Sequence, residues 1–154
     1  MRSVNYRGFT LIELLVVIAI IGLLSTLAVI ALNSARQKSR DTKRLSDIRQ
    51  IATALELFYT DSNVYPTEAS PVELGQGGYS AICSNGFQAT CTGTAYMGLV
   101  PQPPVPADGT CSDTNNQYLY SSPDGQSYSL SFCLGSMVGN LGAGLHTASP
   151  SGIE

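Results

Sequence analysis

The sequence has little positive charge, and all of it lies in the first third of the chain. Only eight of the 154 residues are Lys or Arg, and none of them follows Arg49. The region from Gln50 to Glu154 carries eight carboxylate side chains and is therefore acidic. Proteins that bind nucleic acid need cations to neutralise its phosphates. The composition therefore argues against nucleic-acid binding by this region.

Residues suited to catalysis or metal binding are also scarce. The one histidine, His146, lies in a glycine-rich segment and is expected to be solvated. The chain has no Cys-x-x-C pair for zinc and no Gly-x-Ser-x-Gly turn for a serine nucleophile. Asp108, Asp113 and Asn115 lack the spacing of an EF-hand and are better explained as turn residues than as calcium ligands. We therefore expect no catalytic residue, no metal and no cofactor.

Cysteine is absent from the first 82 residues and then occurs four times, as Cys83, Cys91, Cys111 and Cys133. An even number of cysteines in a short, polar, loop-rich region favours two disulfides and an oxidising compartment over four buried thiols. Three pairings are possible. We favour the pairing of nearest neighbours, Cys83 with Cys91 and Cys111 with Cys133.

Proline is absent before Pro66, and this first region has helical character. Nineteen uncharged, mostly apolar residues run from Leu14 to Leu32. As a helix they span about 28 Å, close to the thickness of a bilayer core. A cleaved secretory signal is the alternative, but its apolar core is shorter, and Asn33-Ser34-Ala35 is a poor cleavage site. The run therefore predicts a membrane-spanning helix.

The helix is expected to continue beyond the apolar run, from about Thr10 to about Thr60. Asp61-Ser62-Asn63, followed by Pro66, supplies its stop signal. Apolar residues at spacings of three and four form one stripe that faces a core. The stripe consists of Leu45, Ile48, Ile51, Ala52, Leu55, Phe58 and Tyr59.

The remaining sequence indicates a small, loop-rich domain with some strands. Residues 117–121 and 126–132 flank a Pro-Asp-Gly turn, and the second segment alternates apolar residues with serine, which predicts an antiparallel hairpin. Residues 66–117 show little periodicity, and residues 135–154 are interpreted as an irregular tail. The predicted fold class is α+β: a long amino-terminal helix packed on an antiparallel sheet of three or four strands.

The segment Arg7-Gly8-Phe9-Thr10-Leu11-Ile12-Glu13, followed by the apolar run, resembles the amino terminus of type IV pilins and of type II secretion pseudopilins. The exit of the helix, with Asp61, Asn63, Tyr65 and Pro66, is similar to that of the same family. The two motifs cover about residues 1–66. One departure is the missing proline within the apolar run, where only Gly22 and Ser25-Thr26 could weaken the helix.

This resemblance implies a role for three residues at the amino terminus. A prepilin peptidase would cut between Gly8 and Phe9, and the new terminus at Phe9 would be N-methylated. Glu13 would then pair with the Phe9 amine of a neighbouring subunit. A lone carboxylate in an apolar helix is costly, so such a pair has a physical reason to form.

The resemblance also implies a domain organisation and a function. Residues 1–8 would be the leader, 9–35 the membrane and filament-core helix, 36–61 its amphipathic continuation, and 62–154 the acidic, disulfide-bonded head. The protein would be a structural subunit of a type IV pilus-like filament. It would be anchored in the cytoplasmic membrane before assembly and found in a surface or periplasmic filament afterwards. Its partners would be its own copies, the peptidase, an assembly platform and an ATPase. The alternatives are a pseudopilin of a type II secretion or competence system, or a membrane-anchored adhesin or binding module.

The basic residues that follow the apolar run raise a question of orientation. The positive-inside rule would place them in the cytoplasm, whereas the cysteines and the resemblance place the head outside. We interpret their charge as neutralised locally by Asp41 and Asp47, or by the acidic heads of adjacent subunits. This basic cluster comprises Arg36, Lys38, Arg40, Lys43, Arg44 and Arg49.

Overall fold

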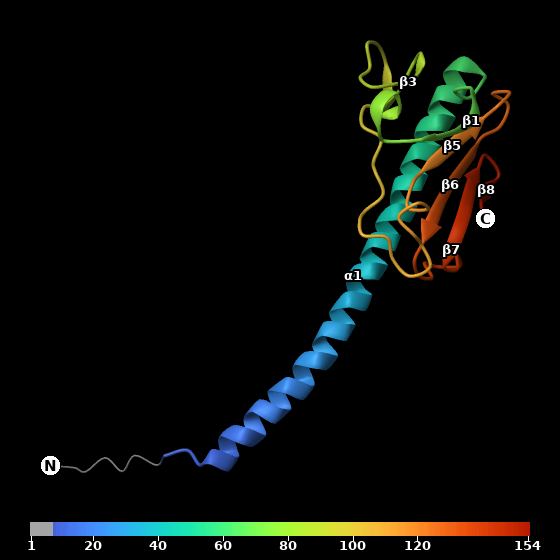
Figure 1. Cartoon of the computed structure of the whole chain (residues 1–154). Coiled ribbons are helices and arrows are strands. Elements are labelled where there is room, and N and C mark those ends of the chain that lie inside the picture. The colour runs from blue at the N-terminus through green and yellow to red at the C-terminus, as the bar shows by residue number, and fades with distance from the viewer. Residues whose placement is uncertain (1–7) are drawn as a thin grey trace. The chain divides into compact units, whose positions relative to one another are not determined.

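A computed structural model describes residues 8–154, so the basic residues of the expected leader, Arg2 and Arg7, lie outside the described part. One long helix, α1 (Leu11–Ser62), dominates the amino-terminal half (Figure 1). Its bounds agree with the predicted helix. It ends at Asn63, which adopts a positive φ of 55° and donates its backbone N–H to the Tyr59 carbonyl at 2.7 Å. A left-handed residue with this bond is a common helix terminator.

The chain divides into two compact units, residues 1–36 and 37–154, and α1 contributes to both. In the described part of the first unit every residue is exposed, including the apolar residues from Leu11 to Leu32. Within the described residues, α1 is the one helix whose length and composition would let it cross a membrane.

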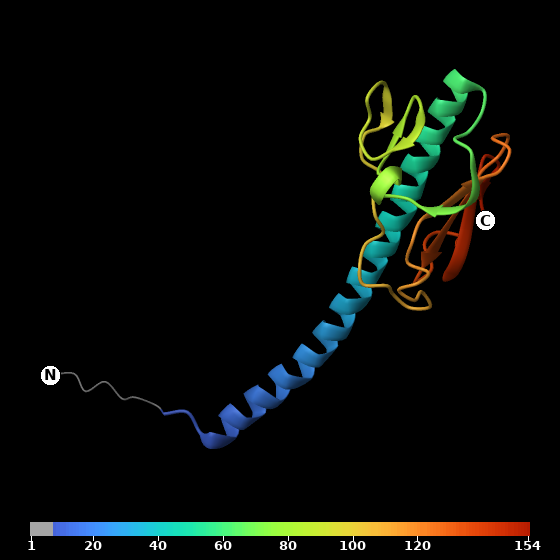
Figure 2. The same cartoon turned by 45° about the horizontal axis from the view of Figure 1, so that its top comes forward.

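The second unit contains two antiparallel sheets on either side of the second half of α1 (Figures 1 and 2). The larger sheet has the strand order β1-β5-β6-β7-β8, and the smaller has the order β3-β2-β4. The strands of the larger sheet are β1 (Glu68–Glu73), β5 (Leu119–Ser122), β6 (Ser129–Leu134), β7 (Gly144–Ser149) and β8 (Gly152–Ile153). The smaller sheet contains β2 (Ala81–Cys83), β3 (Gly86–Gln88) and β4 (Ala95–Met97), and the short helix η1 (Gly77–Tyr79) precedes it.

The α+β class and the predicted hairpin are confirmed. Strands β5 and β6 pair antiparallel, with Leu119 opposite Ser131 and Tyr120 opposite Leu130. The alternation in this segment places Tyr128, Leu130 and Phe132 in the core. Every second side chain of a strand points to the same face, so this face covers α1 while the serines point away from it.

Two expectations about the sheet were wrong. Residues 135–154 are not an irregular tail, because β7 and β8 extend the larger sheet to five strands. The larger sheet alone thus exceeds the expected three or four strands, and residues 66–117, whose sequence shows little periodicity, contain four strands. Glycines hid β7 and β8 from the sequence pattern: Gly144 and Gly152 adopt φ values of 127° and 134°, which suit residues without a side chain.

The predicted stripe of α1 forms the centre of the core. Ile48, Ile51 and Leu55 are fully buried, whereas Ala52 and Tyr59 lie at the edge of the cluster. The sheets and the residues that flank their strands supply the partners of these side chains. The largest buried partners are Tyr118, Tyr120, Leu130, Phe132, Ile82 and Leu74.

Both disulfides follow the favoured pairing. Cys83 is bonded to Cys91 at the end of β2, and Cys111 is bonded to Cys133 in β6. The described residues contain no free cysteine. The second bond closes the longer stretch of chain, with a sequence separation of 22 against 8 for the first.

We expect removal of the Cys111–Cys133 bond to destabilise the fold more than removal of Cys83–Cys91. Chain-entropy arguments give about 3 kcal/mol for bonds of this size, with about 1 kcal/mol more for the longer loop. The measurement is urea unfolding of two double variants, Cys111→Ala with Cys133→Ala and Cys83→Ala with Cys91→Ala, each in the full chain in detergent. A larger loss from the second variant would contradict this prediction.

Candidate functional site

The expected processing site lies just before the first turn of α1. Gly8, Phe9 and Thr10 precede the helix, and all three are exposed. Phe9 is 87% exposed, and a side chain placed at Gly8 would meet no atom within 4 Å. The bond between Gly8 and Phe9 is therefore free of helical structure and of tertiary contacts with the described residues.

Thr10 and Glu13 cap the first turn of α1 reciprocally. The backbone N–H and the hydroxyl of Thr10 donate to Oε2 of Glu13 at 2.8 and 2.7 Å. In return, the Glu13 backbone N–H donates to the Thr10 hydroxyl at 3.3 Å. This is a capping box, which satisfies backbone donors that no helical carbonyl reaches. The Thr-x-x-Glu spacing carries this signal in the sequence, where its meaning was missed.

The capping box leaves one carboxylate oxygen of Glu13, Oε1, free to accept a hydrogen bond. Both bonds that its carboxylate accepts end on Oε2, and no described residue donates to Oε1. Phe9 lies outside the helix and donates no hydrogen bond to Glu13, whose partner among the described residues is Thr10. The side chain is thus held in one orientation while one oxygen can still accept a hydrogen bond.

The apolar part of α1 stays helical through its weakest positions. No break occurs at Gly22 or at Ser25, and the Thr26 hydroxyl donates to the Leu23 carbonyl at 2.8 Å. A hydroxyl bonded to its own helix needs no other partner in an apolar environment. The apolar run, which lacks a proline, is therefore an unbroken helix in the single chain.

Further along α1, Arg44 occupies the centre of a buried polar cluster. Its side chain is fully buried and donates to Asp41 at 2.7 Å and to Asp108 at 3.3 Å. It also donates to the Asn116 side chain, and to two carbonyls of the proline-rich segment, Pro104 and Pro106. A buried charge is tolerated when every donor is satisfied, as it is here.

The carboxylates of this cluster reach further into the second unit. Asp41 accepts from the backbone N–H of Gly135 at 2.9 Å and from the Ser136 hydroxyl at 2.7 Å. Around it, the chain at Gly109 runs so close to Gly135 that a Cβ on either glycine would overlap backbone atoms. The cluster therefore joins α1, the proline-rich segment and the end of β6 at one point.

This cluster decides between the two interpretations of the basic residues, in favour of local neutralisation for three of them. Local neutralisation by Asp41 and Asp47 is confirmed, since Arg44 pairs with Asp41 and Lys43 pairs with Asp47 at 2.7 Å. Arg40 makes two bonds of 2.6 Å to Asp108. Arg44 is buried inside its own chain and cannot meet the acidic head of another subunit.

Asp108 is likewise committed within the chain, which contradicts its possible role in binding calcium. Both of its oxygens accept from guanidinium groups. The hydrogen bond from Arg40 is the main cause that lowers the pKa of Asp108, with Arg44 adding to it against the effect of burial. The described residues contain no group of His, Cys, Asp and Glu arranged to hold a metal ion.

His146 is a structural residue of β7 and not a solvated residue of a tail. Its ring lies 5.6 Å from that of Phe132. Its two ring nitrogens lie within hydrogen-bonding distance of the carbonyls of Glu154 and Gly142, at 3.0 and 2.9 Å. These contacts tie β7 to the carboxy terminus.

Comparison with known proteins agrees with these features. The family described as "Prokaryotic N-terminal methylation motif" matches residues 4–29. The type II secretion system core protein G of Klebsiella michiganensis is 42% identical over 67 residues, which cover 44% of this chain and 47% of that protein. The protein of the same name from Escherichia coli is 42% identical over 67 residues and is covered to 46%. The chain thus spans about half the length of these relatives. No solved structure matches it.

A further relative extends into the head. The type IV major fimbrial protein FimA of Dichelobacter nodosus is 32% identical over 111 residues, which cover 70% of this chain and 68% of that protein. A single long helix with an apolar first half, followed by a disulfide-bonded antiparallel head, defines a pilin-like protein. The chain belongs to the family of type IV pilins and type II secretion pseudopilins.

We expect the variant Arg44→Met to lose about 3 to 5 kcal/mol of unfolding free energy, because it leaves the buried Asp41 carboxylate without a cation. The control is Lys38→Met. Lys38 is exposed, and its ammonium makes no ion pair with any described residue, so its loss should cost at most about 0.5 kcal/mol. Urea unfolding of the full chain in detergent measures both. Equal losses from the two variants would show that Arg44 does not hold the cluster together.

The lowered pKa of Asp108 predicts a dependence of stability on pH. Ionised Asp108 stabilises the fold fully above the ordinary carboxyl pKa of about 4, and this contribution is lost as the pH falls through the lowered value of the folded state. Asp108→Asn should therefore be less stable than the wild type at pH 7, and the difference should shrink below about pH 4. Unfolding free energies measured from about pH 7 to about pH 2.5 test this. Asp113→Asn is the exposed control, and a difference for Asp108→Asn that does not change with pH would refute the prediction.

Proposed function

We propose that this chain is a prepilin, a structural subunit that is processed between Gly8 and Phe9 and polymerises through α1 into a type IV pilus-like filament. The observation that carries the proposal is the first turn of α1, where a capped carboxylate stands at the start of a fully exposed apolar helix. In this proposal residues 1–8 are the leader, 9–35 the membrane and filament-core segment, 36–61 its amphipathic continuation and 62–154 the head.

Cleavage at Gly8 is supported by the local backbone. Proteases bind their substrates in extended conformation, and residues 8–10 are not helical. Gly8 has no side chain to hinder entry into a cleft. Cleavage by a prepilin peptidase would leave Phe9 two residues before the helix, with a new amino group that is cationic at neutral pH and open to N-methylation.

The new amino group gives Glu13 a partner on a neighbouring subunit. A carboxylate and an ammonium group are each costly to bury alone, and pairing offsets much of that cost. Thr10 holds the Glu13 carboxylate through Oε2 and leaves Oε1 to accept from the amine of Phe9. Because the partner exists only after cleavage, the pair would restrict assembly to processed chains and fix the register between them.

The apolar surface of α1 would serve in two environments. The exposed residues from Leu11 to Leu32 match the thickness of a bilayer core and would anchor the subunit in the cytoplasmic membrane. The same surface would be buried against other copies in the filament. A contact between different surfaces of identical subunits repeats without closing and gives an open helical polymer. An assembly platform and an ATPase would move subunits from the membrane into a surface or periplasmic filament, and the chain itself would be no enzyme.

A pseudopilin of a type II secretion or competence system is the second candidate. Several relatives named as type II secretion core protein G are 40% or more identical, which favours it. Those matches cover only 67 residues or fewer, whereas the type IV fimbrial relative matches over 111 residues. The longer match reaches the head, which is the basis for preferring a pilus.

Mass spectrometry of sheared surface filaments tests this function. We expect a mature chain that begins at N-methylated Phe9 in the filament fraction. Glu13→Gln removes the charge at nearly constant shape, so this variant should enter the membrane but be strongly depleted from filaments. Ser25→Ala, a second polar change in the same helix, is the control and should assemble. A chain that keeps Met1, a chain cut near Arg36, or normal assembly of Glu13→Gln would contradict the proposal.

A further inference from the structure

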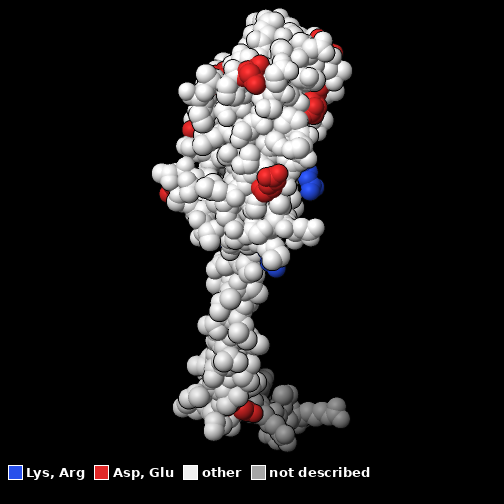
Figure 3. All heavy atoms as spheres, turned by 90° about the vertical axis from the view of Figure 1, so that its right-hand side faces the viewer, with Lys and Arg blue, Asp and Glu red and all other residues white. Residues whose placement is uncertain are grey.

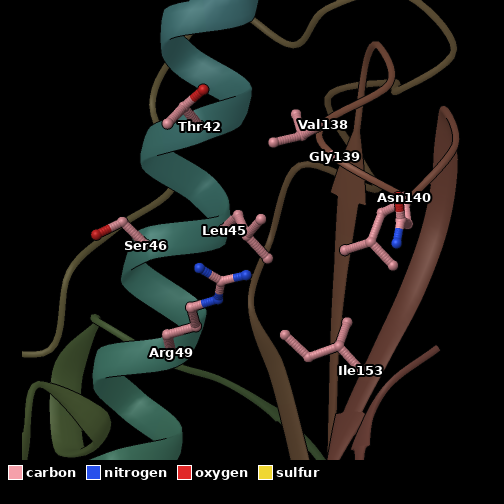
Figure 4. A pocket seen from close by; sticks show the side chains of 9 residues that line it. Thr42, Leu45, Ser46, Arg49, Val138, Gly139, Asn140 and Ile153 are labelled. Carbon is pink, nitrogen blue, oxygen red and sulfur yellow. The ribbon is translucent and has the colours of Figure 1, made fainter.

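A groove runs along the second unit between α1 and the edge of the larger sheet. It has a volume of about 630 Å³ and is lined on one side by the helix and on the other by the loop before β7 and by β8 (Figure 4). Leu45, Val138, Leu141 and Ile153 form the apolar part of its walls, and Thr42, Ser46 and Asn140 add polar groups. Figure 4 shows Arg49 extending from α1 into this groove, which we call the Arg49 groove.

Arg49 supplies the positive charge of the groove, and this charge is uncompensated. Its guanidinium makes no ion pair or hydrogen bond with any described residue, and the residue is exposed. Arg40, Lys43 and Arg44 on the same helix are all paired with carboxylates. An unpaired guanidinium over apolar walls suits a carboxylate that is accompanied by an apolar group.

The second unit offers few carboxylates for such a contact. Acidic side chains are scattered over the face seen in Figure 3, with few basic ones between them. Most carboxylates of the second unit already accept a hydrogen bond from another side chain of the same chain. Those with no side-chain donor among the described residues are Asp113, Asp124 and Glu154.

Asp124 is the best match to the groove. It follows Pro123 at the exposed tip of the β5–β6 turn, so a carboxylate and an apolar ring are neighbours in the sequence. Its Oδ1 accepts from the Gln126 backbone N–H at 3.0 Å, and no described residue donates to Oδ2. Asp113 lies between Ser112 and Thr114 and offers no apolar neighbour.

The turn is also held rigid before any contact forms. The Tyr65 backbone N–H donates to the Gly125 carbonyl at 2.8 Å, and Gly125 has a positive φ of 69°. A Cβ at this glycine would lie 3.2 Å from Thr67 and from the Tyr65 carbonyl oxygen. A preorganised turn loses little conformational entropy on docking.

We infer that the Pro123–Asp124 turn of a second copy of this chain docks in the Arg49 groove. The inference rests on the proposed function, because the filament brings copies together with their helices parallel. The turn lies beside the end of α1, and Arg49 lies 13 residues before that end, or about 20 Å along the helix axis. A second copy displaced by that distance along the axis places its Asp124 level with Arg49.

Charge reversal in full-length chains tests this contact. We expect Arg49→Glu and Asp124→Lys each to lower the yield of sheared filaments by about tenfold, and their combination to restore most of it. Arg49→Lys keeps the charge and should assemble. The matched controls reverse unpaired charges elsewhere on the second unit: Lys38→Glu on α1 and Asp113→Lys in a loop. Thermal unfolding should change little in any variant, because these side chains make no ion pairs within the chain and Asp124→Lys removes one exposed hydrogen bond, which the Gln126 backbone N–H donates at 3.0 Å.

A photo-cross-link identifies the partner directly. A diazirine-bearing amino acid in place of Ser46, which lines the groove, should capture a peptide containing Pro123 and Asp124 from a second copy. Four outcomes would overturn the inference. Three concern the cross-link: capture of the Asp113 peptide, capture of a different protein, or no cross-link at all. The fourth is a double charge reversal that fails to restore filaments.

The result for the wild type separates the two hypotheses. If the wild-type chain and the Arg49→Glu variant form filaments in equal yield, the docked turn is refuted and the proposed function as a filament subunit still holds. Absence of the wild-type chain from the filament fraction would refute the proposed function and the docking together.

Discussion

The second unit depends on one buried cation. Arg44 connects α1 to the proline-rich segment and, through Asp41, to the end of β6, so it replaces apolar packing at the place where three parts of the chain meet. Such a cluster is a weak source of net stability, but it has strict geometry, because each missing partner leaves a buried polar group. The nearby disulfide Cys111–Cys133 and the close approach of Gly109 to Gly135 hold the same junction.

Much of the fold could be predicted because its signals are local. The absence of proline and the spacing of Ile48, Ile51 and Leu55 are enough to define α1 and its buried face. The β5–β6 hairpin was visible in the alternation of serine with aromatic and aliphatic residues. The short strands of the smaller sheet and the strands β7 and β8 were not visible, since glycine and serine interrupt any period and their pairing partners are distant in sequence.

The functional residues were predicted only where their signals, like those of the fold, are local in the sequence. Gly8, Phe9 and Glu13 stand in one short motif, so their expected roles can be inferred from neighbouring residues alone, although the part of Thr10 in capping Glu13 was overlooked. Arg44 lies among other basic residues and looks like one more exposed cation. Its burial depends on Asp108 and Asn116, more than 60 residues away, and no pattern near Arg44 reveals them.

The absence of Lys and Arg after residue 49 has a consequence for the sensitivity of the second unit to proteases. Proteases of the trypsin type cut after Lys or Arg, and residues 50–154 offer them no site. The sites in the second unit all lie on α1, where the helical backbone cannot adopt the extended shape that a protease cleft requires. The second unit therefore resists this class of proteases through its composition after residue 49 and through the helical backbone before it.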